Sequence, residues 1–157
     1  MRKYVLGQAE ITTSSSKEID CLQNTAVGFT SADPANPVEN LFDGDLATCW
    51  SSASDDRTEQ ILITFDAPKS LTKIVYEVIE REFQRTQEVQ IEVSVDGENF
   101  RRVFVQEYVF SPSGANYEKQ DLKLEMRDVS ALRLTVIPNK NGSGRAKLTS
   151  LHLFEWI

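Results

Sequence analysis

Hydrophobic and polar residues alternate along most of this chain, with a period of two rather than 3.6. In the run VQIEVSV, Val89, Ile91, Val93 and Val95 fall on one side and the polar residues between them on the other. This pattern is typical of a half-buried strand. Strand-like runs of the same class are ILITF (61–65), LTKIVYEVI (71–79), FRRVFVQEYVF (100–110), LKLEM (122–126), ALRLTVI (131–137) and KLTSLHLFEW (147–156).

Turn-forming residues separate these runs. The pair Asp96-Gly97 favours a tight hairpin, residues 66–70 predict a turn, and residues 139–145 predict a loop between two strands. Only residues 37–42, with a proline at the start, predict a short helical turn. Short strands separated by Gly, Pro, Asn and Asp predict an all-β sandwich or barrel.

The composition limits the classes of function. The 157 residues are expected to form a single domain, 1–157, and the net charge of −7 argues against a nucleic-acid partner. The same charge repels anionic lipid, so a membrane partner is not expected. One histidine and two cysteines supply no obvious nucleophile–base pair, which predicts that the chain is not an enzyme. Cys21 and Cys49 are too few for a disulfide framework; they could pair with each other, but two free thiols in a reducing compartment are the expectation.

The N-terminal residues bear on localisation. MRKYVLGQAEI lacks the apolar run and the cleavage site of a secretory signal. If Met1 is native, this predicts a cytoplasmic protein. If the chain is a fragment, it is expected to be extracellular or part of a larger secreted protein.

The stretch NLFDGDLATCWSS (40–52) is the richest in candidate chemistry, and three interpretations compete for it. It could be a tight turn only, since Asp and Gly favour turns. It could hold two catalytic carboxylates, although Asp43 and Asp45 would project from one small loop rather than flank a cleft. It could bind a hard cation, with charge from Asp43 and oxygens from Thr48. The third possibility needs a second charged ligand, for which Glu155 is a candidate if the chain ends meet.

Four blocks in the chain, in this order, resemble the discoidin or coagulation-factor C-type domain, a group of galactose-binding-like fold that includes the family 32 carbohydrate-binding modules. The blocks are NLFDGDLATCWSS, QILITFDAPKSLTKIVYEV, VQIEVSVDGENFRRV and ALRLTVIPNKNGSGRAKLTSLHLFE, and the resemblance covers about residues 25–156. It implies an eight-stranded jelly-roll β-sandwich with one structural calcium ion.

The resemblance also implies the calcium ligands. They would be the carbonyls of Asn40, Asp45 and Phe154, the side chains of Asp43 and Glu155, and both oxygens of Thr48. Such an ion would fasten an N-terminal loop to the last strand, and Trp50 would then lie in the core rather than under a sugar.

In this fold, the loops at one end of the sandwich bind the ligand. Here these loops would be 31–37, 51–60, 80–87 and 139–145. Sugar recognition needs planar hydrogen-bond donors and an aromatic face, so the candidates are Arg57, Phe83, Arg85, Asn139, Asn141 and Arg145. Each could equally be an ordinary solvated loop residue, and Phe83 either stacks on a ligand or folds back into the core. His152, on the last strand, is expected to be packed or half exposed rather than catalytic.

The function predicted from these features is a non-catalytic carbohydrate-binding module with a structural calcium, whose partner is a glycan such as a galactose-type sugar. The alternative is an intracellular protein–protein interaction module of the same fold.

Overall fold

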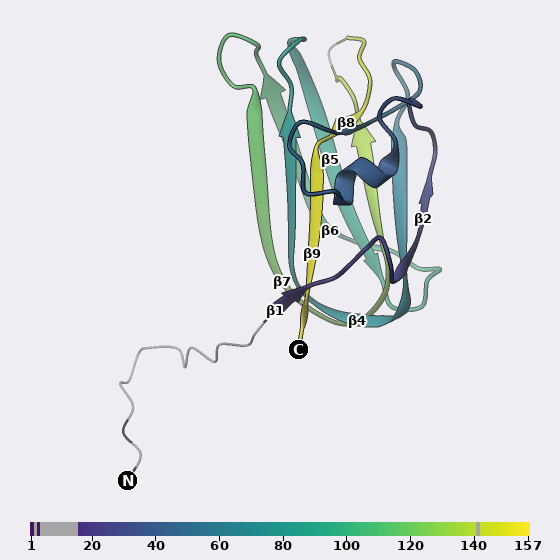
Figure 1. Ribbon diagram of the computed structural model, residues 1–157, viewed down its shortest axis with the longest axis vertical. Coiled ribbons are helices and arrows are strands. Elements are labelled where there is room, and N and C mark those ends of the chain that lie inside the picture. The colour runs from purple at the N-terminus through teal and green to yellow at the C-terminus, as the bar shows by residue number, and fades with distance from the viewer. Residues whose placement is uncertain (2, 4–15, 141) are drawn as a thin grey trace.

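The computed structural model describes residues 1, 3, 16–140 and 142–157, and the regular structure in them is almost entirely β (Figure 1). One 3₁₀ helix, η1 (Val38–Phe42), follows Pro37 as the proline pattern predicts. The strands are β1 (Ser16–Glu18), β2 (Thr25–Phe29), β3 (Trp50–Ser51), β4 (Glu59–Ile79), β5 (Arg85–Ser94), β6 (Arg101–Phe110), β7 (Tyr117–Ile137), β8 (Lys147–Leu148) and β9 (Ser150–Trp156).

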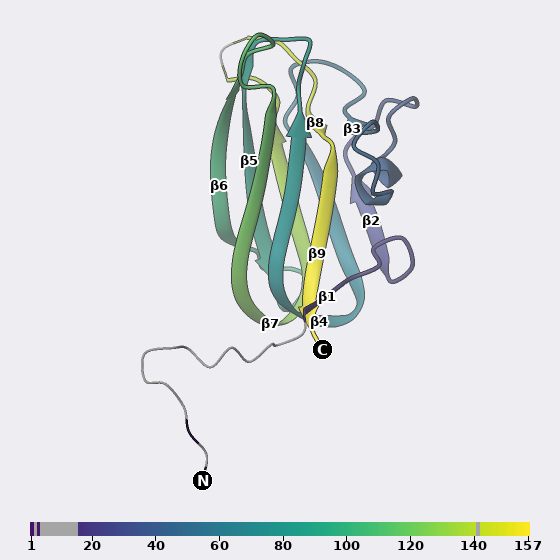
Figure 2. The ribbon, with the colours of Figure 1, turned by 60° about the vertical axis from the view of Figure 1, so that its left-hand side comes forward.

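Two long strands, β4 and β7, are shared by both layers of the sandwich. The first half of β4 pairs with β2, and the second half pairs with β9. The second half of β7 pairs with β5, which pairs in turn with β6, while β1 adds to β9. The two layers therefore face each other as a jelly roll, seen from a second side in Figure 2. The predicted all-β jelly-roll sandwich is confirmed.

The prediction that a turn at 66–70 separates two strands was wrong. The chain runs through these residues as the single strand β4, with Lys69 opposite Val129 and register shifts in the pairing with β7 between Thr64 and Lys73. Such bulges bend a strand sharply without ending it, which is how one strand can serve two sheets. In the same way, β7 joins the predicted runs 122–126 and 131–137, with a positive φ of 56° at Asp128.

The core between the layers confirms the alternation read from the sequence. Val89, Ile91 and Val93 are buried, whereas Val95 is 61% exposed because β5 ends at Ser94. The β5–β6 connection is a hairpin, but residues 95–100 make it longer than a two-residue turn. Gly97 in this loop adopts the positive φ of 80° that glycine tolerates best.

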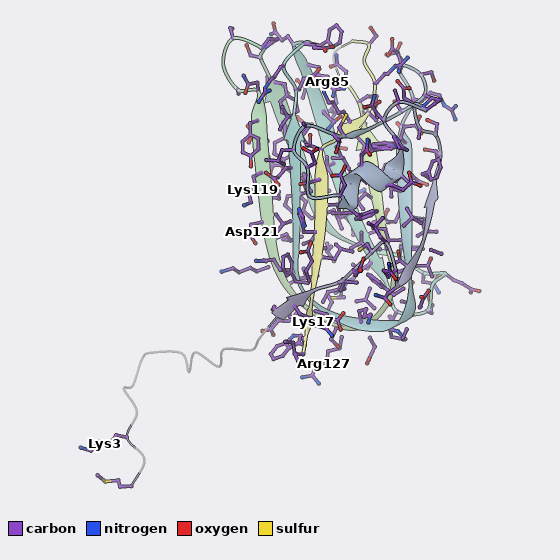
Figure 3. All side chains as sticks on the ribbon, in the orientation of Figure 1. Lys3, Lys17, Arg85, Lys119, Asp121 and Arg127 are labelled. Carbon is purple, nitrogen blue, oxygen red and sulfur yellow. The ribbon has the colours of Figure 1, made fainter. Side chains whose placement is uncertain are left out.

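Loops from several parts of the chain gather at the end of the sandwich opposite the C-terminus (Figures 1 and 2). They include the connections between β2 and β3, β3 and β4, β4 and β5, β6 and β7, and β7 and β8. Figure 3 shows the Arg85 side chain at this end, whereas Lys17 and Arg127 lie at the opposite end. Among the described residues, no helix has the length and apolar character needed to span a bilayer.

Candidate ligand-binding site

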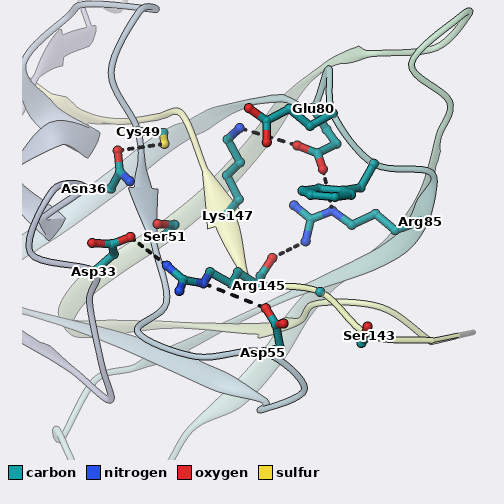
Figure 4. Close-up of a pocket in the computed structure, with 13 residues that line it drawn as sticks. Asp33, Asn36, Cys49, Ser51, Asp55, Glu80, Arg85, Ser143, Arg145 and Lys147 are labelled. Carbon is teal, nitrogen blue, oxygen red and sulfur yellow. Dashed lines mark hydrogen bonds and ion pairs between the residues drawn. The ribbon is translucent and has the colours of Figure 1, made fainter.

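The four loops that the sequence predicts as a binding surface enclose a pocket of about 580 Å³ (Figure 4). This volume lies within the range of small-molecule sites. The pocket is lined by Asp33, Asn36, Cys49, Ser51, Asp55, Glu80, Glu82, Phe83, Arg85, Ser143, Gly144, Arg145 and Lys147. The fold therefore brings three of the predicted ligand-binding residues, Phe83, Arg85 and Arg145, to one cavity.

Arg85 forms one wall of the pocket and is held from several sides. Its side chain is buried, and its Nε lies 3.4 Å from Oε1 of buried Glu80, an ion pair without hydrogen-bond geometry. The guanidinium also donates to the carbonyls of Arg145 and Pro138. Burial lowers the pKa of Arg85, and the charge of Glu80 opposes this. Arg85 thus ties the β7–β8 loop to β5 rather than projecting freely.

Lys147 meets the same buried carboxylate from the other side. Its Nζ lies 3.4 Å from Oε2 of Glu80, so one acid bridges two cations at the base of the pocket (Figure 4). Opposite charges in this arrangement offset the cost of burying the carboxylate.

Arg145 links three of the loops. Its Nη1 donates to Oδ2 of Asp33 at 2.6 Å, and its Nε lies 3.8 Å from Oδ1 of Asp55. Figure 4 shows the guanidinium between these two carboxylates. The side chain is 46% exposed, so its planar donors remain accessible to a ligand.

Phe83 lies at the rim of the pocket and is 63% exposed. Of the two fates that the sequence leaves open for this aromatic, the structure excludes the core. An exposed ring beside accessible planar donors offers both kinds of surface that a sugar needs.

The other predicted ligand-binding residues have different positions. Asn139 braces the β7–β8 loop: its Oδ1 accepts from the Thr86 amide at 3.2 Å, and its Nδ2 donates to the Ser143 carbonyl at 3.0 Å. Arg57 is exposed and does not line the pocket. Asn141 lies outside the described residues.

Sequence reasoning missed the acids of the site. Asp33, Asp55, Glu80 and Glu82 all lie in the loops predicted as the binding end, yet none of them is among the candidates that the sequence suggested. The signal was the arginine itself, because arginine is the cation that proteins use most readily in buried ion pairs with carboxylates.

Trp50 is a core residue that contacts one of the loops of this site. It is fully buried, as the resemblance implies, and its Nε1 donates to the Ser31 carbonyl at 3.1 Å. The Ser31 hydroxyl in turn donates to buried Glu59 at 2.8 Å. These contacts anchor the loop that carries Asp33.

The two cysteines are free, as predicted. Burial raises the pKa of the Cys21 thiol to about 12. Cys49 lines the pocket, where burial also raises its pKa. His152 lies half exposed on β9 with its ring against the Glu18 carboxylate, which agrees with the expectation of a packed strand histidine.

Four of the six predicted calcium ligands share one turn. Oδ1 of Asp43 accepts from the Asp45 amide at 2.9 Å. The Thr48 hydroxyl lies within hydrogen-bond distance of Oδ2 of Asp43 and of the Asp45 carbonyl. The Asn40 side chain donates to the Cys49 carbonyl at 2.9 Å. The turn thus gathers several oxygens around a single carboxylate.

The contacts of Phe154 and Glu155 are with β4 and β1. Glu155 forms an ion pair with Lys69 at 3.4 Å, and the Phe154 ring lies 4.4 Å from Nζ of Lys73. Leu151 is the β9 residue that shares a small pocket with Phe42, the neighbour of Asp43, and Glu155 lies about 13 Å further along the strand.

The oxygens gathered at this turn make up part of a calcium shell. In the part of the chain that the structure describes, no group of three or more His, Cys, Asp or Glu residues could hold a metal. Calcium prefers six to eight oxygens, with affinity set by the number of charged ligands. Calcium at the Asn40–Thr48 turn stays a prediction.

The comparison with known families agrees with the fold and with the resemblance. The F5/8 type C domain family matches residues 10–150. This chain belongs to the F5/8 type C domain family. The comparison with curated protein sequences gave no match.

This F5/8 type C domain is similar in structure to solved family 32 carbohydrate-binding modules. The module of C. perfringens NanJ, solved in complex with galactose, is 15% identical, with 89% of this chain and 99% of that chain covered and a TM-score of 0.63. CBM32-3 from a family 31 glycoside hydrolase of Clostridium perfringens is 25% identical, with 89% and 95% covered and a TM-score of 0.63. The CBM32 of AlyQ, in complex with 4,5-unsaturated mannuronic acid, is 20% identical, with 88% and 98% covered and a TM-score of 0.64. The domain thus has the fold of a carbohydrate-binding module.

Proposed function

We propose that this domain is a non-catalytic carbohydrate-binding module that binds a glycan in the pocket at the loop end of the sandwich. The observation that carries the proposal is the exposed aromatic Phe83 at the rim of a cavity whose polar groups are fixed by ion pairs. The proposal is supported by two modules of similar fold that were solved with sugars: the NanJ module with galactose and the AlyQ module with 4,5-unsaturated mannuronic acid.

The chemistry of the pocket suits a sugar ring. Sugar hydroxyls are donors and acceptors together, so they need partners of both kinds at fixed positions. Arg145 supplies planar donors, and Asp33 and Asp55 supply acceptor oxygens. The C–H face of a ring packs on an aromatic side chain, which Phe83 offers.

The same arrangement favours binding over catalysis. Glycoside hydrolysis uses a carboxylic acid and a carboxylate that flank the scissile bond. Here Asp33 and Asp55 both meet Arg145, and Glu80 meets Arg85 and Lys147. Paired acids of this kind position a ligand rather than transfer a proton.

Removing the aromatic rim tests the proposal. We expect Phe83→Ala to weaken binding of galactose by about twofold to twelvefold, because ring contacts contribute about 0.5–1.5 kcal/mol. The measurement is an NMR or calorimetric titration at millimolar sugar. Val109→Ala is the matched control, since Val109 is also 63% exposed but lies on β6 away from the pocket lining. Absence of saturable binding to neutral, amino and acidic sugars alike would contradict the proposal.

We also propose that the Asn40–Thr48 turn binds calcium weakly, through one carboxylate and nearby oxygens. With an affinity on the order of 10⁻³ M, about 10 mM CaCl₂ should raise Tm by about 4 °C. Asp43→Asn should remove this shift, while Asp121→Asn on the exposed face of β7 (Figure 3) should keep it. A large loss of Tm on adding EDTA alone, or an undiminished shift in Asp43→Asn, would contradict a weak site.

A further inference from the structure

Each cation that lines the pocket already forms an ion pair with an acidic side chain of the protein. Arg85 and Lys147 both meet Glu80 at 3.4 Å. Arg145 meets Asp33 at 2.6 Å and Asp55 at 3.8 Å. An anionic ligand would therefore have to compete with a carboxylate that is held in place by the fold.

Glu82 differs from the other acids of the pocket. It is exposed and lines the cavity beside Phe83. Within the described ranges, it forms no hydrogen bond or ion pair. Among the described residues that line the pocket, Glu82 is thus the charged side chain without a protein partner, and its charge is negative.

The net charge of the pocket and of the whole chain also favours a positively charged ligand. Four acids and three cations line the described pocket, and the chain as a whole carries a net charge of −7. A positively charged ligand is attracted by this field, and a negatively charged ligand is repelled. A neutral ligand is indifferent to it and depends on hydroxyl contacts and ring packing.

We infer that this pocket discriminates among sugars by charge: it favours amino sugars that carry a free ammonium group, accepts neutral sugars, and rejects uronic acids. Glu82 is the residue that receives the ammonium group. This inference rests on the proposed function, because it concerns the ligand class of the same pocket.

The test is a comparison of three sugars that differ in one substituent: galactose, galactosamine and galacturonic acid. Titrations are run at low ionic strength and about pH 6, where a primary amine of pKa near that of an α-amino group is protonated. We expect galactosamine to bind about 1.5-fold to fivefold more tightly than galactose, the range of an exposed ion pair. We expect galacturonic acid to bind at least about threefold more weakly than galactose, and high salt to shrink both differences.

Two variants connect the preference to Glu82. In Glu82→Gln, the ratio of galactosamine to galactose affinity should fall to about one. Glu98→Gln removes the same charge from the exposed hairpin between β5 and β6, at the other end of the sandwich, and should keep the ratio. Thermal unfolding of both variants is measured as the control that the fold is intact.

The outcomes separate the two proposals. If galactose binds but galacturonic acid binds as tightly, or if Glu82→Gln keeps the preference for galactosamine, the inference about charge is overturned and the proposed function stands. If none of the three sugars binds, both are overturned.

Discussion

Replacing Arg85 with methionine is expected to lower the free energy of unfolding by about 3–5 kcal/mol and to abolish sugar binding. The substitution leaves the nearly fully buried carboxylate of Glu80 without one of its two cations, and removal of one partner from a buried ion pair has costs of this size. It also removes the donor to the carbonyls of Pro138 and Arg145, which holds the β7–β8 loop against β5. Because that loop carries Arg145, the pocket loses its shape along with its stability.

Urea unfolding and a galactose titration measure the two effects. Arg57→Met is the matched control, because Arg57 is an exposed arginine that does not line the pocket, and a change within about 0.5 kcal/mol is expected there. The double variant Arg85→Met/Glu80→Met should lose less than the sum of the two single variants, since it leaves no uncompensated carboxylate. A loss below about 1 kcal/mol in Arg85→Met would contradict the expected dependence of Glu80 on Arg85.

Replacing Trp50 with alanine is the second change with a large expected effect, about 3–5 kcal/mol of unfolding free energy. Trp50 is fully buried in the core, and its indole donates to the Ser31 carbonyl beneath the loop that carries Asp33. Loss of the ring leaves a cavity, and loss of the donor leaves that carbonyl without this partner. Sugar affinity should fall as well, because Asp33 holds Arg145.

The second tryptophan of the chain provides the control. Trp156 is 44% exposed at the end of β9, so Trp156→Ala should change stability by no more than about 0.5 kcal/mol. Denaturant unfolding of the two variants measures the difference. Comparable small losses in both would contradict the role of Trp50 as a core residue.

The loops of the site were predicted from the family resemblance rather than from a local pattern, and the four loops that it implies contribute most of the residues that line the pocket. Phe83 was singled out by its residue type, as an aromatic among charged residues. The continuity of β4 was not readable, because a bulge and a turn use the same residue types. Residue order also does not show which part of β9 lies near η1; in the structure, Leu151 of β9 and Phe42 of η1 line the same small pocket.

The sequence by itself determined the class of fold: alternation with a period of two, broken by Gly, Pro, Asn and Asp, admits strands and turns and little else. Only the tertiary structure decided which charges meet. Arg145 pairs with Asp33, 112 residues away, and Lys147 pairs with Glu80, 67 residues away. Periodicity acts between neighbours in the chain, whereas these ion pairs form only after β4 and β7 have crossed between the two sheets and carried distant loops to one end.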